Sequence, residues 1–208
     1  TGLMNASIQV MYPGIFKTLH FDPIKDFTPV GVFGFAPMVA VVRAQSPIQS
    51  FRGLIDAARA RGIPVLQVFH TSPSDDPANP FSLASGHVQT LKELRIAPTA
   101  VFHKTVHSSL YAKDETGASL HDWLLKHGIE GVIVSGIRTE QCCETTTRHA
   151  SDDGFKVVFP TDATLTFAMQ SPSGKHYTPA EIRDATELVL QGRFARIARA
   201  ADVFADAQ

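Results

Sequence analysis

GVIVSGIRTEQCCETTTRHASDDG, residues 131–154, is the stretch of this 208-residue chain that indicates the fold. Its first part, Gly131–Gly136, places β-branched residues between glycines, which is typical of a strand buried on both faces. Thr139–Asp153 then predicts a helix that ends at Gly154, because glycine commonly follows the last residue of a helix. A buried strand that leads into a helix is one unit of a parallel α/β sheet.

The same alternation continues on both sides of this stretch. Further strands are predicted at Met38–Arg43, Ile63–His70 and Lys156–Pro160, and further helices at Gln49–Arg61, Ser119–His127 and Ala180–Ala201. Strands that alternate with helices imply parallel strands joined by right-handed crossovers, with helices on both faces. We therefore predict an α/β fold with a doubly wound, mostly parallel sheet in three layers. Such folds carry their chemistry at the carboxyl ends of the strands.

Composition excludes several classes of protein. With 44% hydrophobic and 19% charged residues, the chain has the composition of a globular protein, not of a long disordered, collagen-like or coiled-coil chain. The formal net charge of −1 argues against a general nucleic-acid binder or a basic membrane-surface protein. The apolar runs are far shorter than the roughly 20 residues that span a bilayer. The two cysteines are adjacent and form no disulfide framework, so we expect a reduced, cytoplasmic setting.

Cys142 is the first candidate for chemistry. It follows the Gly131–Gly136 strand closely enough to lie in the first turn of the next helix. The positive end of the helix dipole and the free backbone N–H groups there favour a thiolate, and the same N–H groups can hold an oxyanion. The alternative is a buried structural cysteine. Cys143 lies about 100° further round the helix and is interpreted as a packing residue.

Lys104 and the histidines are the other candidates. Lys104 comes just after a short strand, where a cation can support a thiolate or an oxyanion, although an exposed surface lysine is the alternative. His70 ends the predicted second strand. The nine histidines form none of the spacings that are typical of metal sites, so we expect no metal and no cofactor.

Three motifs resemble the isochorismatase-like cysteine hydrolases, over about residues 51–208. They are LIDAARARGIPVLQV at 54–68, FHKT at 102–105 with SSL at 108–110, and GIRTEQCCETTTRHA at 136–150. The last resembles the long signature that contains the family's nucleophilic cysteine, and Cys142 falls on that position. The second resembles the stretch that contains the catalytic lysine, which falls on Lys104.

The resemblance implies further site residues and a reaction. A non-prolyl cis peptide bond would fall at Ile137–Arg138, next to backbone groups that serve the oxyanion together with Cys142. We expect His70 and Thr139 to contact the substrate. The implied activity is hydrolysis of an amide-type C–N bond of a small molecule through a thioester, by a homo-oligomer that binds neither nucleic acid nor membrane.

One catalytic residue of the family is missing. Its aspartate, at the end of the first strand, has no match, and Arg43 stands in its place. We expect Met38–Arg43 to occupy the central first-strand position, and residues 1–37 to form an atypical segment outside the hydrolase domain of residues 38–208. An arginine cannot accept the thiol proton, so the cysteine is expected to be reactive but slow in turnover. The alternative is that another carboxylate, such as Asp22, Asp26 or Asp75, folds into the site and replaces the missing aspartate.

Residues from about 8 to 60 resemble a different family. The stretches YPGIFKTLHFDPIKDFTPV at 12–30 and APMVAVV at 36–42 are similar to an internal piece of Bug-type tricarboxylate solute-binding receptors. Two alternatives to the hydrolase therefore stay open: a solute-binding or interaction module, and a non-catalytic remnant of the hydrolase family.

Overall fold

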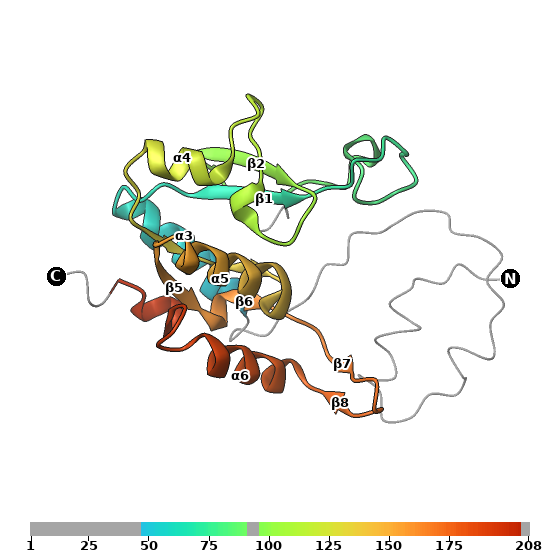
Figure 1. Cartoon of the computed structure of the whole chain (residues 1–208), viewed down its shortest axis with the longest axis vertical. Helices are drawn as coiled ribbons and strands as arrows, with labels where there is room; N and C mark the ends of the chain where they lie inside the picture. The colour runs from blue at the N-terminus through green and yellow to red at the C-terminus, as the bar shows by residue number, and fades with distance from the viewer. Residues whose placement is uncertain (1–46, 91–95, 205–208) are drawn as a thin grey trace, which may run out of the picture. The chain divides into compact units, whose positions relative to one another are not determined.

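The computed structural model describes residues 47–90 and 96–204 (Figure 1). All of them fall within one of the chain's two compact units, Ala44–Gln208. The segment 1–37, the predicted strand Met38–Arg43 and the residue Arg43 itself lie outside the described residues, so what the sequence predicts for them stays a prediction.

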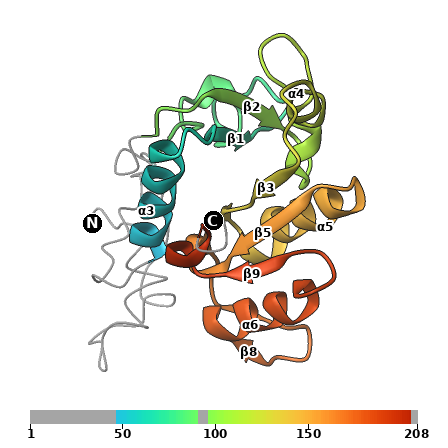
Figure 2. The same cartoon turned by 90° about the vertical axis from the view of Figure 1, so that its left-hand side faces the viewer.

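Two groups of parallel strands carry the fold, as the strand and helix alternation predicts (Figure 2). In the first group, β1 (Leu66–His70) pairs with β2 (Ala100–Lys104), so that His70 lies opposite Lys104. The second group has three strands: β3 (Gly131–Ile133), β5 (Lys156–Pro160) and β9 (Arg196–Ala198). β5 lies in the middle and pairs with the other two. Two further pairs consist of two-residue strands. β4 (Gly136–Ile137) runs parallel to β6 (Thr164–Leu165), and β7 (Met169–Gln170) runs antiparallel to β8 (His176–Tyr177).

Within residues 47–90 and 96–204, four α-helices and several short turns connect the strands. The α-helices are α3 (Pro47–Ala60), α4 (Leu120–Lys126), α5 (Glu144–Asp152) and α6 (Pro179–Leu190). The short turns are η1 (Leu83–Ser85), η2 (Ser109–Tyr111), η4 (Thr161–Ala163) and η5 (Ala200–Asp202), all of the 3₁₀ type, and the π-helical η3 (Thr139–Cys143).

Side-chain caps set the starts of two helices. The Ser119 hydroxyl accepts a hydrogen bond from the Asp122 N–H at the start of α4. A reciprocal pair of hydrogen bonds between Thr178 and Glu181, with a proline at the first position, does the same for α6.

Alternation along β5 places helices on both of its faces. Val157 and Phe159 belong to a core cluster that also holds Phe102 of β2 and Ala150 of α5. Val158 packs instead against a second cluster, which holds Leu54 of α3. Successive side chains of a strand point to opposite faces, so α3 and α5 cover opposite faces of this strand. This arrangement supplies the three layers that the sequence predicts.

The predicted helix Ala180–Ala201 is wrong in its second half. α6 ends at Leu190, and Gly192 adopts a φ of 72°, a left-handed conformation that favours glycine. The chain then turns back and forms β9, which pairs with β5. The apolar residues that suggested a continued helical stripe, among them Ile197, therefore belong to a strand.

The stretch 131–154 also differs in detail from its prediction. β3 ends at Ile133, and Gly136 begins the separate strand β4. Val132 and Ile133 are half-buried, where burial on both faces was expected, because β3 has a single strand partner among the described residues. The predicted helix Thr139–Asp153 is divided into the π-helical η3 and α5.

Candidate active site

Cys142 lies in η3, the turn that leads from β4 into α5. The Arg138 carbonyl begins this turn and accepts hydrogen bonds from the backbone N–H groups of Gln141 and Cys143. The Cys142 side chain is half-buried. The cysteine therefore stands at a helix N-terminus, where the sequence places it, and keeps some access to solvent.

Lys104 reaches Cys142 from the other strand group. Its Nζ lies 3.2 Å from the Cys142 Sγ, although the two residues are 38 positions apart in the chain. Lys104 is the last residue of β2, at the carboxyl end of that strand. The predicted proximity of the two residues is confirmed, while their catalytic roles stay predictions.

The Lys104 ammonium is buried, with 5% of the residue exposed, so the alternative of an exposed surface lysine is wrong. Nζ donates hydrogen bonds to the carbonyl oxygens of Val106 at 2.9 Å and His107 at 3.0 Å. A buried charge needs such partners to offset its loss of hydration. These two acceptors could not be predicted from the sequence, because any residue type supplies a backbone carbonyl.

His70 is the fourth partner of Lys104. Its Nδ1 lies 3.2 Å from the Lys104 Nζ, as expected from the pairing of the last residues of β1 and β2. An ammonium only donates hydrogen bonds, so Nδ1 is the acceptor and carries no proton. Burial, with further contributions from Lys104 and His107, holds the pKa of His70 below its ordinary value of 6.5. The ring is therefore neutral at pH 7, and its edge contacts the exposed Phe81 ring.

Cys143 differs from its neighbour in every respect that matters for reactivity. It is 4% exposed and belongs to the larger core cluster. Burial, together with Cys142, raises the pKa of the Cys143 thiol to about 12. Cys143 is therefore a protonated packing residue, as the sequence indicates.

The backbone before the turn contains a cis peptide bond between Ile137 and Arg138, the position that the resemblance implied. Ile137 is exposed, while the Arg138 guanidinium lies beside Glu140 and over the Phe167 ring. Thr139 is fully buried, and its hydroxyl is hydrogen-bonded to that of Thr164 at 2.8 Å. With no exposed side-chain surface, Thr139 supports the start of η3, and the predicted contact with substrate would need its backbone.

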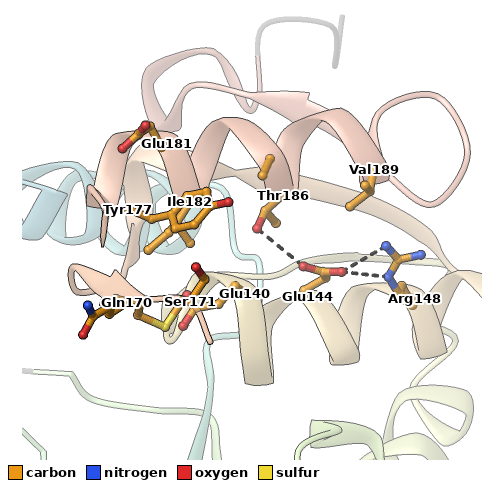
Figure 3. Close-up of a pocket in the computed structure, with 12 residues that line it drawn as sticks. Glu140, Glu144, Arg148, Gln170, Ser171, Tyr177, Glu181, Ile182, Thr186 and Val189 are labelled. Carbon is orange, nitrogen blue, oxygen red and sulfur yellow. Dashed lines mark hydrogen bonds and ion pairs between the residues drawn. The ribbon is translucent and has the colours of Figure 1, made fainter. Parts of the chain in front are cut away.

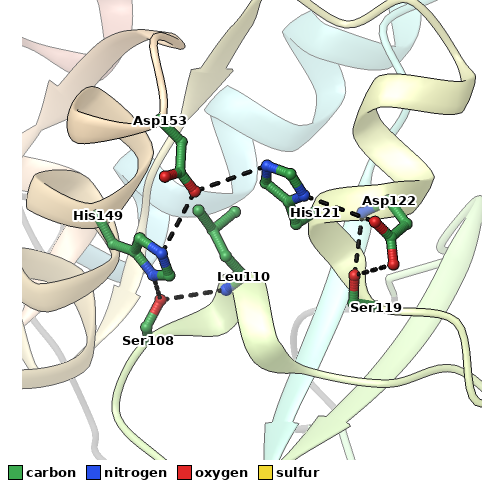
Figure 4. Close-up of polar contacts among 7 residues, drawn as sticks. All are labelled: Ser108, Leu110, Ser119, His121, Asp122, His149 and Asp153. Carbon is green, nitrogen blue, oxygen red and sulfur yellow. Dashed lines mark hydrogen bonds and ion pairs between the residues drawn. The ribbon is translucent and has the colours of Figure 1, made fainter.

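A second polar cluster lies near the site and was not predicted (Figure 4). Ser108 Oγ is 2.7 Å from His149 Nδ1, and His149 Nε2 is 3.3 Å from Asp153 Oδ2. His121 Nε2 approaches the same carboxylate oxygen at 3.6 Å. The types and order of the first three residues are those of a nucleophilic triad. Ser108 is only 5% exposed, however, and its oxygen also accepts the Leu110 N–H, so the cluster ties η2 to α5.

A cavity of about 490 Å³ lies apart from both clusters, between α5, α6 and the β7–β8 hairpin (Figure 3). Its acidic side chains already have partners: Glu144 binds Arg148 at 2.9 Å, and Glu181 caps α6. Neither Cys142 nor Lys104 lines it. The cavity is therefore not the candidate active site.

Three classes of feature are absent from residues 47–90 and 96–204. No carboxylate makes a hydrogen bond or ion pair with Cys142 or Lys104 in this part of the chain. Nor does this part gather three or more side chains that could hold a metal ion. Its helices include none with the length and apolar character that crossing a membrane requires.

Comparisons with known proteins give the family of the chain. The isochorismatase domain matches residues 22–185. The uncharacterized isochorismatase family protein YrdC of Bacillus subtilis (strain 168) is 29% identical over 147 residues, which are 69% of this chain and 74% of that protein. Nicotinamidase 3 of Arabidopsis thaliana is 33% identical over 125 residues, which are 54% of this chain and 61% of that protein. The crystal structure of a hydrolase of the isochorismatase family from Chromobacterium violaceum ATCC 12472 matches with a TM-score of 0.67 and 26% identity, over 76% of this chain and 79% of that chain.

The domain match begins at residue 22, well before the position near residue 51 where the sequence motifs begin to resemble the family. The similarity of residues 8–60 to solute-binding receptors is not addressed by these comparisons and stays a prediction. The predicted fold class is confirmed, because the solved structures share this α/β architecture with its mostly parallel strands. The isochorismatase domain match covers most of the length of this chain. The chain therefore belongs to the isochorismatase family and is a hydrolase of that family.

Proposed function

We propose that this chain is a cysteine hydrolase that cleaves the C–N bond of a small amide, with Cys142 as the nucleophile. The observation that supports this most directly is the 3.2 Å contact between the Lys104 ammonium and the Cys142 sulfur. A thiolate is the reactive form of cysteine, and a neighbouring cation stabilises it. The similarity to a nicotinamidase supports an amide as the substrate.

The proposed reaction has two stages. The Cys142 thiol gives up its proton, the thiolate attacks the amide carbonyl carbon, and the C–N bond breaks. The departing nitrogen takes up that proton and leaves as ammonia or an amine, with a thioester on Cys142. Water then hydrolyses the thioester, which releases the acid and regenerates the thiol. Backbone groups around Ile137–Arg138 and the N–H of Cys142 are the proposed donors to the oxyanion, and Lys104 supports the developing negative charge.

We infer that the substrate is small and has an apolar part. Phe81 and Ile137 are exposed, and Phe81 contacts His70 beside the buried lysine. We propose that these three side chains border the bound substrate. The assembly of the protein as a homo-oligomer stays a prediction.

Ammonia release tests the proposal. Wild-type protein is assayed with nicotinamide and with simple aliphatic and aromatic amides, and the acid-quenched reaction is examined by mass spectrometry for an acyl group on Cys142. Cys142→Ala should abolish both signals, whereas Cys143→Ala, at the neighbouring packing residue, should retain both. Activity that persists in Cys142→Ala would contradict the proposal.

The proposed reaction also needs a group that takes the thiol proton. Arg43, the residue predicted at the position of the family's aspartate, cannot do so because a guanidinium stays protonated. Without any acceptor, turnover should be slower by about 10²–10⁴-fold, the usual contribution of general acid–base catalysis.

A further inference from the structure

The surroundings of Lys104 hold more hydrogen-bond partners than its ammonium can serve. Nζ lies within 3.2 Å of four atoms: two backbone carbonyl oxygens, the Cys142 sulfur and the His70 Nδ1. An ammonium carries three protons. The two carbonyls are the nearer partners and occupy two of them, so the third proton is shared between the sulfur and the imidazole nitrogen.

Of these partners, His70 is the one that can take up a proton. Carbonyl oxygens accept hydrogen bonds but do not become protonated near neutral pH, and among the described residues no carboxylate contacts Lys104 or Cys142. His70 presents an unprotonated Nδ1 to the lysine, 3.2 Å from the same Nζ that contacts the sulfur.

We propose that His70 accepts the Cys142 thiol proton through Lys104 and later returns it to the leaving amine. This inference rests on the proposed function and adds to it the proton acceptor that Arg43 cannot supply. His70 acts through the lysine, so it is a positioning and proton-holding residue that does not itself contact the reacting atoms.

The proton transfer balances at each step. The S–H bond of Cys142 breaks and its proton passes to Nζ, while Nζ gives one of its own protons to Nδ1 of His70. Lys104 thus remains an ammonium between a thiolate and an imidazolium. After the sulfur attacks the carbonyl carbon, the C–N bond breaks with its electron pair on nitrogen. That nitrogen takes a proton from Nζ, His70 returns its proton to Nζ, and ammonia leaves.

The electrostatics of His70 suit this role. Burial, Lys104 and the exposed His107 are the influences that lower its pKa. The ring is therefore neutral before reaction and available as an acceptor. A weakly basic imidazole also returns its proton readily once the thiolate charge has been consumed.

The test replaces His70 by asparagine, which keeps a polar side chain of similar reach but cannot hold the proton. The matched control is His103→Asn, one position before Lys104 on β2, where the ring stacks on Phe69. In His70→Asn, kcat for ammonia release should fall by about 10²–10⁴-fold, with a smaller change in KM and with loss of the acidic limb of the pH profile. His103→Asn should retain the wild-type profile.

A second readout does not depend on turnover. Iodoacetamide labelling of Cys142 against pH should move to higher pH by about one unit in His70→Asn, because the thiolate loses the imidazolium as a partner. An unchanged labelling profile, or an equal change in His103→Asn, would overturn the inference. If no amide is hydrolysed but this shift occurs, the proposed function and the return of the proton to an amine both fail, while the acceptance of the thiol proton by His70 stands.

A third measurement leaves His70 in place. Its titration, followed by NMR, should have a lower midpoint in Cys142→Ala than in the wild type, because the thiolate that stabilises the imidazolium is gone. Equal midpoints in the two proteins would overturn the inference, whatever the folding of the His70 variant.

Discussion

Two clusters in the described part of this chain combine a histidine with a potential nucleophile, and they differ in burial and in charge. The first joins Cys142, Lys104 and His70 across two strand groups, and Cys142 is only half-buried. The second joins Ser108 and His149, with Asp153 behind them, in the order of a hydrolytic triad, but its hydroxyl is buried. Residue types alone would rank the second cluster higher. Access for a substrate and the position of a cation decide in favour of the first.

Lys104→Met should strongly reduce activity and so tests whether the first cluster is the reactive one. The substitution removes the buried cation that stabilises negative charge at the sulfur, so ammonia release should fall by about 10²–10³-fold or more. The matched control is Lys156→Met, at an exposed lysine whose nearest charged partner is Glu130 at 3.6 Å. Steady-state assays at several pH values, with circular dichroism to verify folding, provide the measurement. A loss shared by both variants would remove the distinction.

A mutation in the second cluster should lower the stability of the protein and leave its activity unchanged. Ser108→Ala leaves His149 without its 2.7 Å partner, which should lower the free energy of unfolding by about 1–3 kcal/mol. Urea denaturation measures this change, with Ser173→Ala in the exposed β7–β8 turn as the control. Ammonia release and Cys142 labelling should stay close to wild type. Abolished activity in folded Ser108→Ala would instead make this cluster the reactive one.

The two adjacent cysteines offer a smaller-scale version of the same comparison. Cys142 should react with iodoacetamide in the native protein, whereas Cys143 should not, because burial keeps it a thiol with a pKa of about 12. Mass spectrometry should find one modified thiol per native chain and two after unfolding in urea. Modification of both thiols at equal rates in the native protein would show that the turn is open.

The lowered pKa of His70 should also make the stability of the protein depend slightly on pH. The folded-state pKa of His70 lies below its ordinary 6.5, so the unfolded chain binds more protons as the pH falls through that value. The contribution of His70 to stability is therefore present above pH 6.5 and lost below it. Urea denaturation at pH 7.5 and 5.5 should show a slightly larger loss for the wild type than for His70→Asn. A larger loss in the variant would contradict the direction of the shift.

The fold was largely predictable because most elements have the periodicity of their final structure. Lys156–Pro160 is a strand with the predicted bounds, since its apolar run fits a strand with helices on both faces. The stretch after Leu190 misled the prediction. Its apolar spacing suits a helix as well as a strand, and the decision falls to Gly192 and to the pairing with β5. Pairing between distant segments leaves no local mark in a sequence.

Some features of the candidate site could likewise be predicted from the sequence, and others could not. Cys142 and Lys104 were identifiable because each lies at or soon after the end of a strand and falls on a catalytic position of the family motifs that the sequence resembles. The contact between Lys104 and the carbonyls of Val106 and His107 was not, because it depends on the path of the backbone after β2. The association of Ser108 with His149 was equally hidden, since it joins residues 41 positions apart.

Because backbone carbonyls hold Lys104, mutations of the residues that carry them can be tolerated during evolution. The main chain at Val106 and His107 holds the cation, while both side chains are exposed to solvent. Mutations at these two positions can therefore alter the exposed surface next to Lys104 without removing the carbonyl oxygens that hold its charge in place. Position 106 is the freer of the two, because the His107 side chain also contributes to lowering the pKa of His70.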